Sequence, residues 1–197
     1  MATTTRRPMA ASDEANPKLA HGDHEVQRFG SLRKLPLGLD DASRRQSCKL
    51  LNEILADSTI LYSLYKKHHW LVSGPTFYQL HLLFDKHAAE QLVLLDSLAE
   101  RVQMLGGIAV SDPRHVAELT NIVRPPNGAE EVPAMLSRLV EAHKIVIGET
   151  RKAIDVTDEN GDSGSNDLLM GDVLRTNEMQ LWFVSAHLVD TPVTDEG

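Results

Sequence analysis

Apolar side chains recur every three or four residues along much of this chain, which is the spacing of one face of an α-helix. In residues 41–70 the recurring positions are Cys48, Leu51, Leu55, Ser58, Tyr62, Tyr65 and His69. The sequence Leu-Val-Ser-Gly-Pro interrupts the pattern at residues 71–75. The pattern therefore predicts a helix over residues 41–70.

A second periodic run follows directly. Its start, Thr76-Phe-Tyr-Gln79, has the spacing of a capping box, in which the Thr hydroxyl and the Gln side chain each bond a free amide at the helix end. Its end is Gly106-Gly107, because glycine readily adopts the left-handed conformation that stops a helix. We expect this helix to cover residues 76–105.

Two more long helices are predicted, at residues 129–156 and 166–189, with an acidic loop between them. The connector at residues 108–128 contains a short helical segment near residues 115–119. Four long helices with one long connection predict an all-α fold, a four-helix bundle with a short helix in the crossover between helices 2 and 3.

The two ends of the chain show no helical period. Residues 1–38 are predicted to form a flexible N-terminal tail and residues 191–197 a short acidic C-terminal tail, on a bundle of residues 39–190. The N-terminus lacks the apolar segment of a secretory signal, and no run of about 18 apolar residues is present to span a membrane. The length of 197 residues fits one domain with appended tails.

Charge and cysteine content narrow the classes further. The formal net charge of -8 disfavours a body surface that binds nucleic acid. A single cysteine, Cys48, excludes an intramolecular disulfide and fits a reducing compartment.

Four side chains of metal-binding types share one face of the second predicted helix. At about 100° for each residue, with His81 at zero, Asp85 lies near 40°, Asp96 near 60° and Glu100 near 100°. Along the axis, however, Asp85 and Asp96 are ~16 Å apart and His81 and Glu100 ~28 Å apart. Bonds to a transition metal are only about 2 Å long, so one chain cannot place all four around one ion.

Two chains can do so. The pairs 81/100 and 85/96 have the same midpoint, between Glu90 and Gln91. Two antiparallel copies of this helix about a two-fold axis therefore bring residue 81 of one copy opposite residue 100 of the other, and residue 85 opposite residue 96. Two equivalent sites result, because a two-fold interface repeats every contact. His69, at the end of the first helix, lies near His81. Each site would contain two histidines and one aspartate from one chain, with two carboxylates from its partner: His69, His81, Asp85, Asp96 and Glu100.

This donor set suits Fe(II), Mn(II) or Zn(II), and bridging carboxylates leave room for a second ion. The alternative is that these histidines pack in the core and the acids form a solvated helix face, in a plain helical bundle without metal.

At these residues the chain resembles the Dps family, the DNA-binding proteins from starved cells, which are ferritin-like mini-ferritins. The resemblance spans residues 45–190 and is closest to actinobacterial-type members with extended tails. It is carried by His68-His69-Trp70, Leu80-His81, Phe84-Asp85, Leu105-Gly106-Gly107 and the sequence Leu-Leu-Asp-Ser-Leu-Ala-Glu-Arg at residues 94–101.

The resemblance implies a ferritin-like bundle that assembles as a hollow homododecamer in the bacterial cytoplasm or nucleoid. It implies a di-iron ferroxidase site shared between two subunits, oxidation of Fe(II) by hydrogen peroxide or oxygen, and storage of a ferric mineral inside. The same five residues become the iron ligands, and Trp70 lies close enough to affect electron transfer, with plain packing as its alternative role.

Other acids and aromatic residues are assigned more loosely. The family places iron pores near the start of the last helix, where Asp167 is our candidate among Asp158, Asp162, Asp167 and Asp172, with a solvated acidic loop as the alternative. Trp182 is expected in the core, His68 at the surface, and His87 near the two-fold axis behind the ligands. His21 and His24 have a spacing that would allow a metal site in the tail.

DNA binding in the family usually depends on cationic tails. The first 35 residues carry six basic and four acidic side chains, a net charge of +2, so binding through this tail is expected to be weak and salt-sensitive. The alternative function is a nucleoid protein that compacts DNA and binds metal only secondarily.

Overall fold

The computed structural model describes residues 25–189, and all regular secondary structure in that range is helical. The elements are α1 (Asp41–Leu71), α2 (Phe77–Met104), α3 (Pro113–Leu119), α4 (Val132–Glu159), α5 (Ser163–Leu168), the π-helical segment η1 (Leu169–Leu174) and α6 (Arg175–Ala186). In the described part of the chain, no helix is both long and apolar enough to cross a bilayer.

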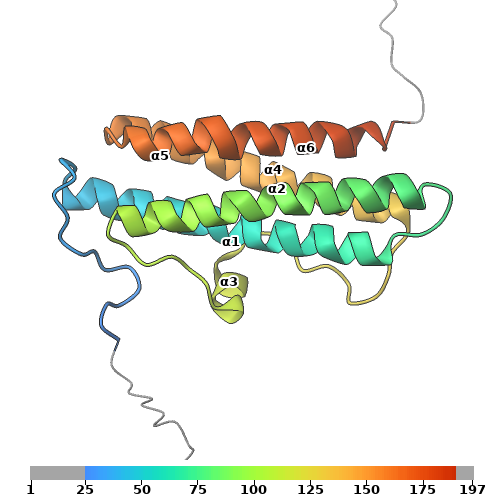
Figure 1. The fold of residues 1–197 in the computed structure, drawn as a ribbon, viewed down its shortest axis with the longest axis horizontal. Helices are drawn as coiled ribbons and strands as arrows, with labels where there is room; N and C mark the ends of the chain where they lie inside the picture. Colours follow the sequence, from blue (N-terminus) through green and yellow to red (C-terminus); the bar gives the residue numbers. More distant parts are fainter. Residues whose placement is uncertain (1–24, 190–197) are drawn as a thin grey trace, which may run out of the picture.

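Figure 1 shows a four-helix bundle in which α5, η1 and α6 run on as one rod. The rod packs on α4, and α4 and α2 both pack on α1. The short helix α3 lies in the long connection between α2 and α4 and packs on α1, on the side away from the rod. The predicted bundle with a short crossover helix is confirmed.

Most helix ends follow from local capping. Asp40 accepts hydrogen bonds from the amides of Ala42 and Ser43 and so begins α1. The capping box predicted at α2 is wrong, because Thr76 has a ψ of 13° and its side chain makes no capping hydrogen bond. α4 begins three residues later than predicted, with Pro133 in its first turn, where a missing amide proton costs nothing.

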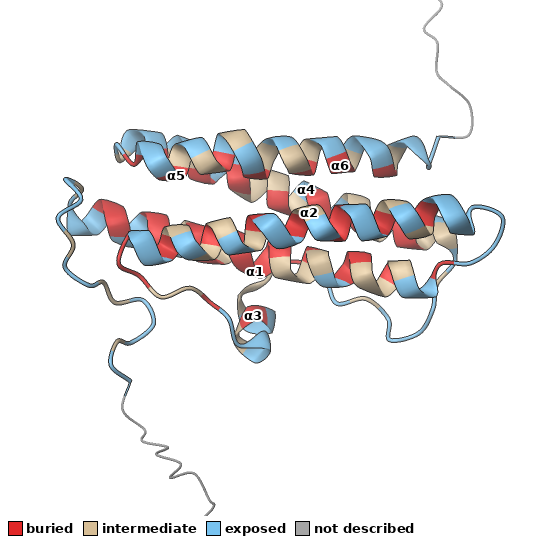
Figure 2. Ribbon diagram, viewed as in Figure 1, coloured by how far each residue is buried: buried red, intermediate tan, exposed pale blue. Residues whose placement is uncertain are grey.

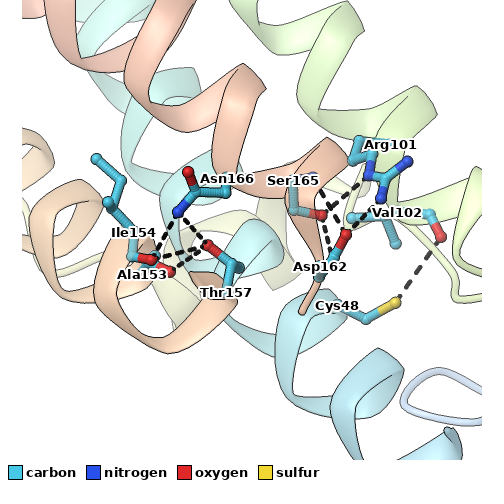
Figure 3. Close-up of polar contacts among 9 residues, drawn as sticks. All are labelled: Cys48, Arg101, Val102, Ala153, Ile154, Thr157, Asp162, Ser165 and Asn166. Carbon is cyan, nitrogen blue, oxygen red and sulfur yellow. Dashed lines mark hydrogen bonds and ion pairs between the residues drawn. The ribbon is translucent and has the colours of Figure 1, made fainter. Parts of the chain in front are cut away.

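The acidic loop predicted between the last two long helices is much shorter than expected. α4 continues to Glu159 and α5 begins at Ser163, so only a tight turn with Gly161 at φ +68° remains. Asp162 makes this turn possible (Figure 3): its carboxylate accepts the Ser165 amide and hydroxyl, and Arg101 at the end of α2 donates to it at 2.5 Å. Because three donors satisfy one buried carboxylate, the second pair of helices is tied to the first.

The core fills both ends of the bundle (Figure 2). One cluster centres on Leu51, Leu98 and Leu169, and the other on Tyr65, Phe84 and Leu139. Burying a side chain of this size contributes roughly 1.5–3 kcal/mol, so these two clusters supply much of the driving force for folding.

The chain before α1 contacts the end of α2. Gly106 adopts φ +86°, and a side chain there would collide with the Arg33 carbonyl oxygen at 2.8 Å. The Gly106 carbonyl oxygen accepts from the Arg33 amide at 2.8 Å and from Gln27 Nε2 at 2.9 Å. The division into tails and bundle stays a prediction, but residues 27–33 are hydrogen-bonded to the body.

Candidate metal centre

Two histidines meet where α1 ends and α2 begins. The short loop after α1 reverses the chain, and the rings of His69 and His81 stack with their centroids 3.8 Å apart. The Nδ1 atom of His69 lies 2.8 Å from the His81 carbonyl oxygen, and the Nδ1 atom of His81 lies 2.9 Å from the His69 carbonyl oxygen.

These reciprocal hydrogen bonds assign the protons. A carbonyl oxygen only accepts, so each Nδ1 must carry a hydrogen, and in the neutral ring Nε2 is the nitrogen left to bind a metal. Neutral imidazole with one nitrogen tied to a carbonyl is the usual form of a metal-binding histidine. The bundle therefore presents two imidazole donors side by side.

Asp85 adds an oxygen one turn further along α2. Its Oδ1 lies 3.9 Å from His69 Nε2, and its side chain is 54% exposed. Lys66 donates to Asp85 Oδ1 at 2.6 Å, and this hydrogen bond is the main reason why the pKa of Asp85 falls below its ordinary value. The carboxylate is thus ionised, with a lysine beside it that the sequence pattern did not single out.

Asp96 and Glu100 are exposed on the same helix, well beyond this group. Within residues 25–189, no three His, Cys, Asp or Glu side chains of one chain lie close enough to hold a metal ion. The structure brings His69, His81 and Asp85 near one another but leaves Asp96 and Glu100 apart from them. The five predicted ligands are therefore not assembled within one subunit.

The acids lie on an exposed apolar stripe of α2, which Figure 2 shows partly as pale blue segments. Leu82, Asp85, Ala89, Leu92 and Asp96 alternate in steps of three and four, the spacing of a helix seam that packs on a second helix. Leu92 is 53% exposed and the adjoining Val93 66%. This stripe would be covered by an antiparallel copy of α2, so the two-fold pairing stays a prediction with a suitable surface.

Comparison with known proteins now adds to this geometry. A family described as "Ferritin-like domain" matches residues 48–193. A "DNA protection during starvation protein" of Agrobacterium fabrum is 34% identical over 139 residues, which are 71% of this chain and 85% of that protein. This chain belongs to the Dps family of ferritin-like proteins.

Solved structures agree with that assignment. DpsC from Streptomyces coelicolor shares 59% identity and a TM-score of 0.85, over 87% of this chain and 99% of that one. Dps from Thermosynechococcus elongatus shares 31% identity and a TM-score of 0.73, over 77% and 95%. The resemblance inferred from the ligand motif is confirmed at the level of family and fold.

The Dps chain exposes both of its tryptophans. Trp70 follows His69, is 70% exposed, and has the Lys66 ammonium 5.9 Å from its ring centre. Its role in electron transfer stays a prediction. Trp182 was expected in the core, which is wrong, since it is 68% exposed and packs edge-on against Phe183. An exposed position on a helical stripe cannot be distinguished from a buried one by period alone.

The expectation for one of two further histidines is also wrong. His68 is fully buried rather than at the surface, and burial lowers its pKa to about 4. His87 is fully buried in the bundle, where it contacts Tyr65, and its expected place near a two-fold axis stays a prediction. Both face inward because the bundle covers a wider arc of α1 and α2 than the apolar stripe alone marks.

The four aspartates considered for an iron pore differ in their burial. Asp162 is buried and serves as the α5 cap, so it is excluded from any pore lining. Asp158, Asp167 and Asp172 are exposed, and Asp167 in α5 remains a prediction. The predicted tail site at His21 and His24 lies outside the described residues.

Proposed function

We propose that this Dps protein oxidises Fe(II), with hydrogen peroxide or oxygen as the oxidant, and stores the ferric product inside a homododecamer. One observation carries the proposal: the rings of His69 and His81 stack with each Nδ1 held by a carbonyl oxygen, beside the ionised Asp85, and α2 bears Asp96 and Glu100 on the same face as His81 and Asp85.

The donor chemistry fits iron as the substrate. Two imidazole nitrogens and three carboxylates bind Fe(II) readily and suit neither a thiolate metal nor an all-oxygen calcium site. Carboxylates bind Fe(III) more strongly than Fe(II), so the site favours loss of an electron. Two irons held together would supply both electrons that peroxide needs, without release of hydroxyl radical.

The proposal requires each site to draw residues from two subunits, and subunit mixing tests this directly. One variant carries His69→Ala and His81→Ala, and the other carries Asp96→Ala and Glu100→Ala. Neither variant alone can form a complete site. In a mixed two-fold pair, one site takes both intact halves and the other takes both damaged halves.

Random mixing in equal amounts should therefore restore about a quarter of the parental fast iron oxidation. The measurement is ferric absorbance after Fe(II) and peroxide are added under anoxic conditions, together with the native mass of each particle. If the mixture stays as inactive as either variant while both assemble as the parent does, the shared site is wrong. If either variant alone keeps the parental rate, the ligand assignment is wrong.

DNA binding is the second candidate function. The relatives named for DNA protection or DNA binding favour it, but the net charge of this chain is -8. We infer weak attachment through many N-terminal segments on one shell, each contributing little.

A further inference from the structure

A chain of polar side chains crosses the centre of the bundle, away from the proposed iron ligands. All of its members are fully buried and come from α1, α2, α4 and α6: Tyr65, His87, Gln91, His143, Asn177 and Gln180. Buried polar groups are costly unless hydrogen-bonded, so their bonding pattern is informative about function.

The protons of this network follow from its fixed acceptors. Asn177 donates through Nδ2 to the Val173 carbonyl at 2.8 Å, which turns its Oδ1 toward His143 Nδ1 at 3.0 Å. His143 therefore carries its hydrogen on Nδ1, and its Nε2 is a bare acceptor. The Tyr65 hydroxyl lies 2.5 Å from that Nε2 and donates to it.

The phenolic oxygen of Tyr65 also accepts a hydrogen bond. His87 Nδ1 lies 3.1 Å from it, so His87 donates while Tyr65 donates onward to His143. Burial raises the pKa of Tyr65 well above its ordinary value and lowers the pKa of His143 to about 3. At neutral pH the group is uncharged, with a phenol held between a donor and a base.

This phenol lies close to the proposed iron site. Tyr65 precedes His69 by four residues on α1, one helical turn or about 6 Å of rise. Its ring also contacts the rings of Phe84 and His87, which flank Asp85 on α2. A side chain one turn from His69, and packed on the neighbours of Asp85, is well placed to exchange an electron with metal bound there.

We propose that Tyr65 is an electron donor to the iron site and that His143 accepts its proton at the same time. This rests on the proposed iron oxidation. A phenol in a dry core cannot lose an electron alone without leaving a charged, strongly acidic species. The short hydrogen bond to a bare nitrogen removes that obstacle, because the proton needs to move only along the existing contact.

The donor matters when a site holds a single Fe(II). Reduction of one hydrogen peroxide to two waters takes two electrons and two solvent protons. Fe(II) supplies one electron and becomes Fe(III). Tyr65 supplies the other; its O–H bond breaks, the proton passes to His143 Nε2, and a neutral phenoxyl radical remains. A second Fe(II) then returns an electron, the imidazolium returns the proton, and both side chains are restored. Hydroxyl radical is never released.

The test adds peroxide to the full-length shell loaded with one Fe(II) for each site and freezes the sample within milliseconds for electron paramagnetic resonance. We expect a tyrosyl signal that narrows when the protein carries ring-deuterated tyrosine. Tyr65→Phe should remove the signal and raise hydroxyl-radical trapping severalfold. Tyr62→Phe is the matched control on the same helix and should keep the signal.

His143→Gln separates the proton acceptor from mere packing. An amide oxygen still accepts the Tyr65 hydrogen bond but is far too weak a base to take the proton, so the radical yield should fall severalfold although Tyr65 is present. In the iron-free parent, ¹⁵N-histidine solid-state NMR should find His143 protonated at Nδ1 and bare at Nε2.

Three results would overturn the inference alone: iron oxidation without any tyrosyl signal, a signal that survives Tyr65→Phe, or the opposite His143 tautomer. A signal insensitive to tyrosine deuteration would reassign the electron to a tryptophan such as Trp70. Failure of the parent to oxidise iron with peroxide would instead overturn the proposed function, and this inference with it.

Discussion

A pair of acids between α1 and α4 gives the sharpest stability prediction. Asp57 is fully buried, and its Oδ1 accepts from the Thr120 hydroxyl at 2.5 Å and the Asn121 amide at 2.7 Å. Within residues 25–189, Asp57 Oδ2 and Glu149 Oε2 are both buried without a donor. Burial, then a hydrogen bond with Asp57, raises the pKa of Glu149 to about 8, so Glu149 is protonated at neutral pH and donates to Asp57.

The sign of the pH dependence follows. A folded-state pKa above the ordinary 4.5 means that this carboxyl stabilises the fold at acidic pH and that the contribution is lost as pH rises toward 8. Between about pH 5 and about pH 8.5 the linkage amounts to roughly 4 kcal/mol. Glu149 is only partly buried and Glu53 lies near it, so screening should reduce this to about 1–3 kcal/mol.

Glu149→Gln tests this value. The amide of glutamine donates permanently to Asp57, so the variant should match the parent near pH 5 and exceed it by about 1–3 kcal/mol near pH 8.5. The assay is urea unfolding at fixed protomer concentration, since assembly also stabilises the fold. Glu141→Gln, an exposed site on the same helix, is the control and should change stability little at either pH.

If the difference in unfolding free energy between Glu149→Gln and the parent stays constant across this pH range, the reasoning is refuted. A constant difference would mean that Glu149 is already ionised at pH 5, so the parent has no proton at this carboxyl left to lose as the pH rises. Infrared spectroscopy gives an independent reading. The parent at neutral pH should show a protonated carboxyl band that the Gln variant lacks.

Three further predictions concern other sites. His68→Leu removes two buried ring nitrogens that have no hydrogen-bond partner in the described residues. Because the pKa of His68 in the folded protein is about 4, the parent loses stability as the pH falls below 6.5, and the variant should be about 2 kcal/mol more stable near pH 5. Urea unfolding that shows no gain at this pH would contradict the prediction. Lys66→Met frees the Asp85 carboxylate, to which Lys66 now donates, so calorimetry should find severalfold tighter binding of Co(II), used as a stable substitute for Fe(II). Unchanged or weaker binding would show that Lys66 does not compete with the metal for Asp85. In gel-shift assays DNA should be retained at ~50 mM salt and released at ~200 mM, and a chain lacking residues 1–24 should bind less at the lower salt; tight retention at ~200 mM would exclude weak tail attachment.

Much of the fold, and the approach of His69 to His81 and Asp85, followed from periodicity and spacing. The first two helices were predicted to within one residue at each end, because long amphipathic runs with glycine at their ends leave little choice. The shared midpoint of 81/100 and 85/96 predicted a site that one chain does not complete, and the structure keeps these acids apart in the subunit. The turn at Asp162 was missed because its stability comes from Arg101, about sixty residues away.

The sequence alone determined which residues share a helix face, since that depends only on the rotation for each residue. It could not determine how wide an arc each neighbouring helix covers, and so it misplaced His68 and Trp182. Tertiary contacts also decided the proton positions: the tautomers of His69 and His81 depend on carbonyls of opposite helix ends, and that of His143 depends on Asn177 of α6. Hydrogen bonds between distant segments leave no period in the chain, so only the assembled bundle reveals them.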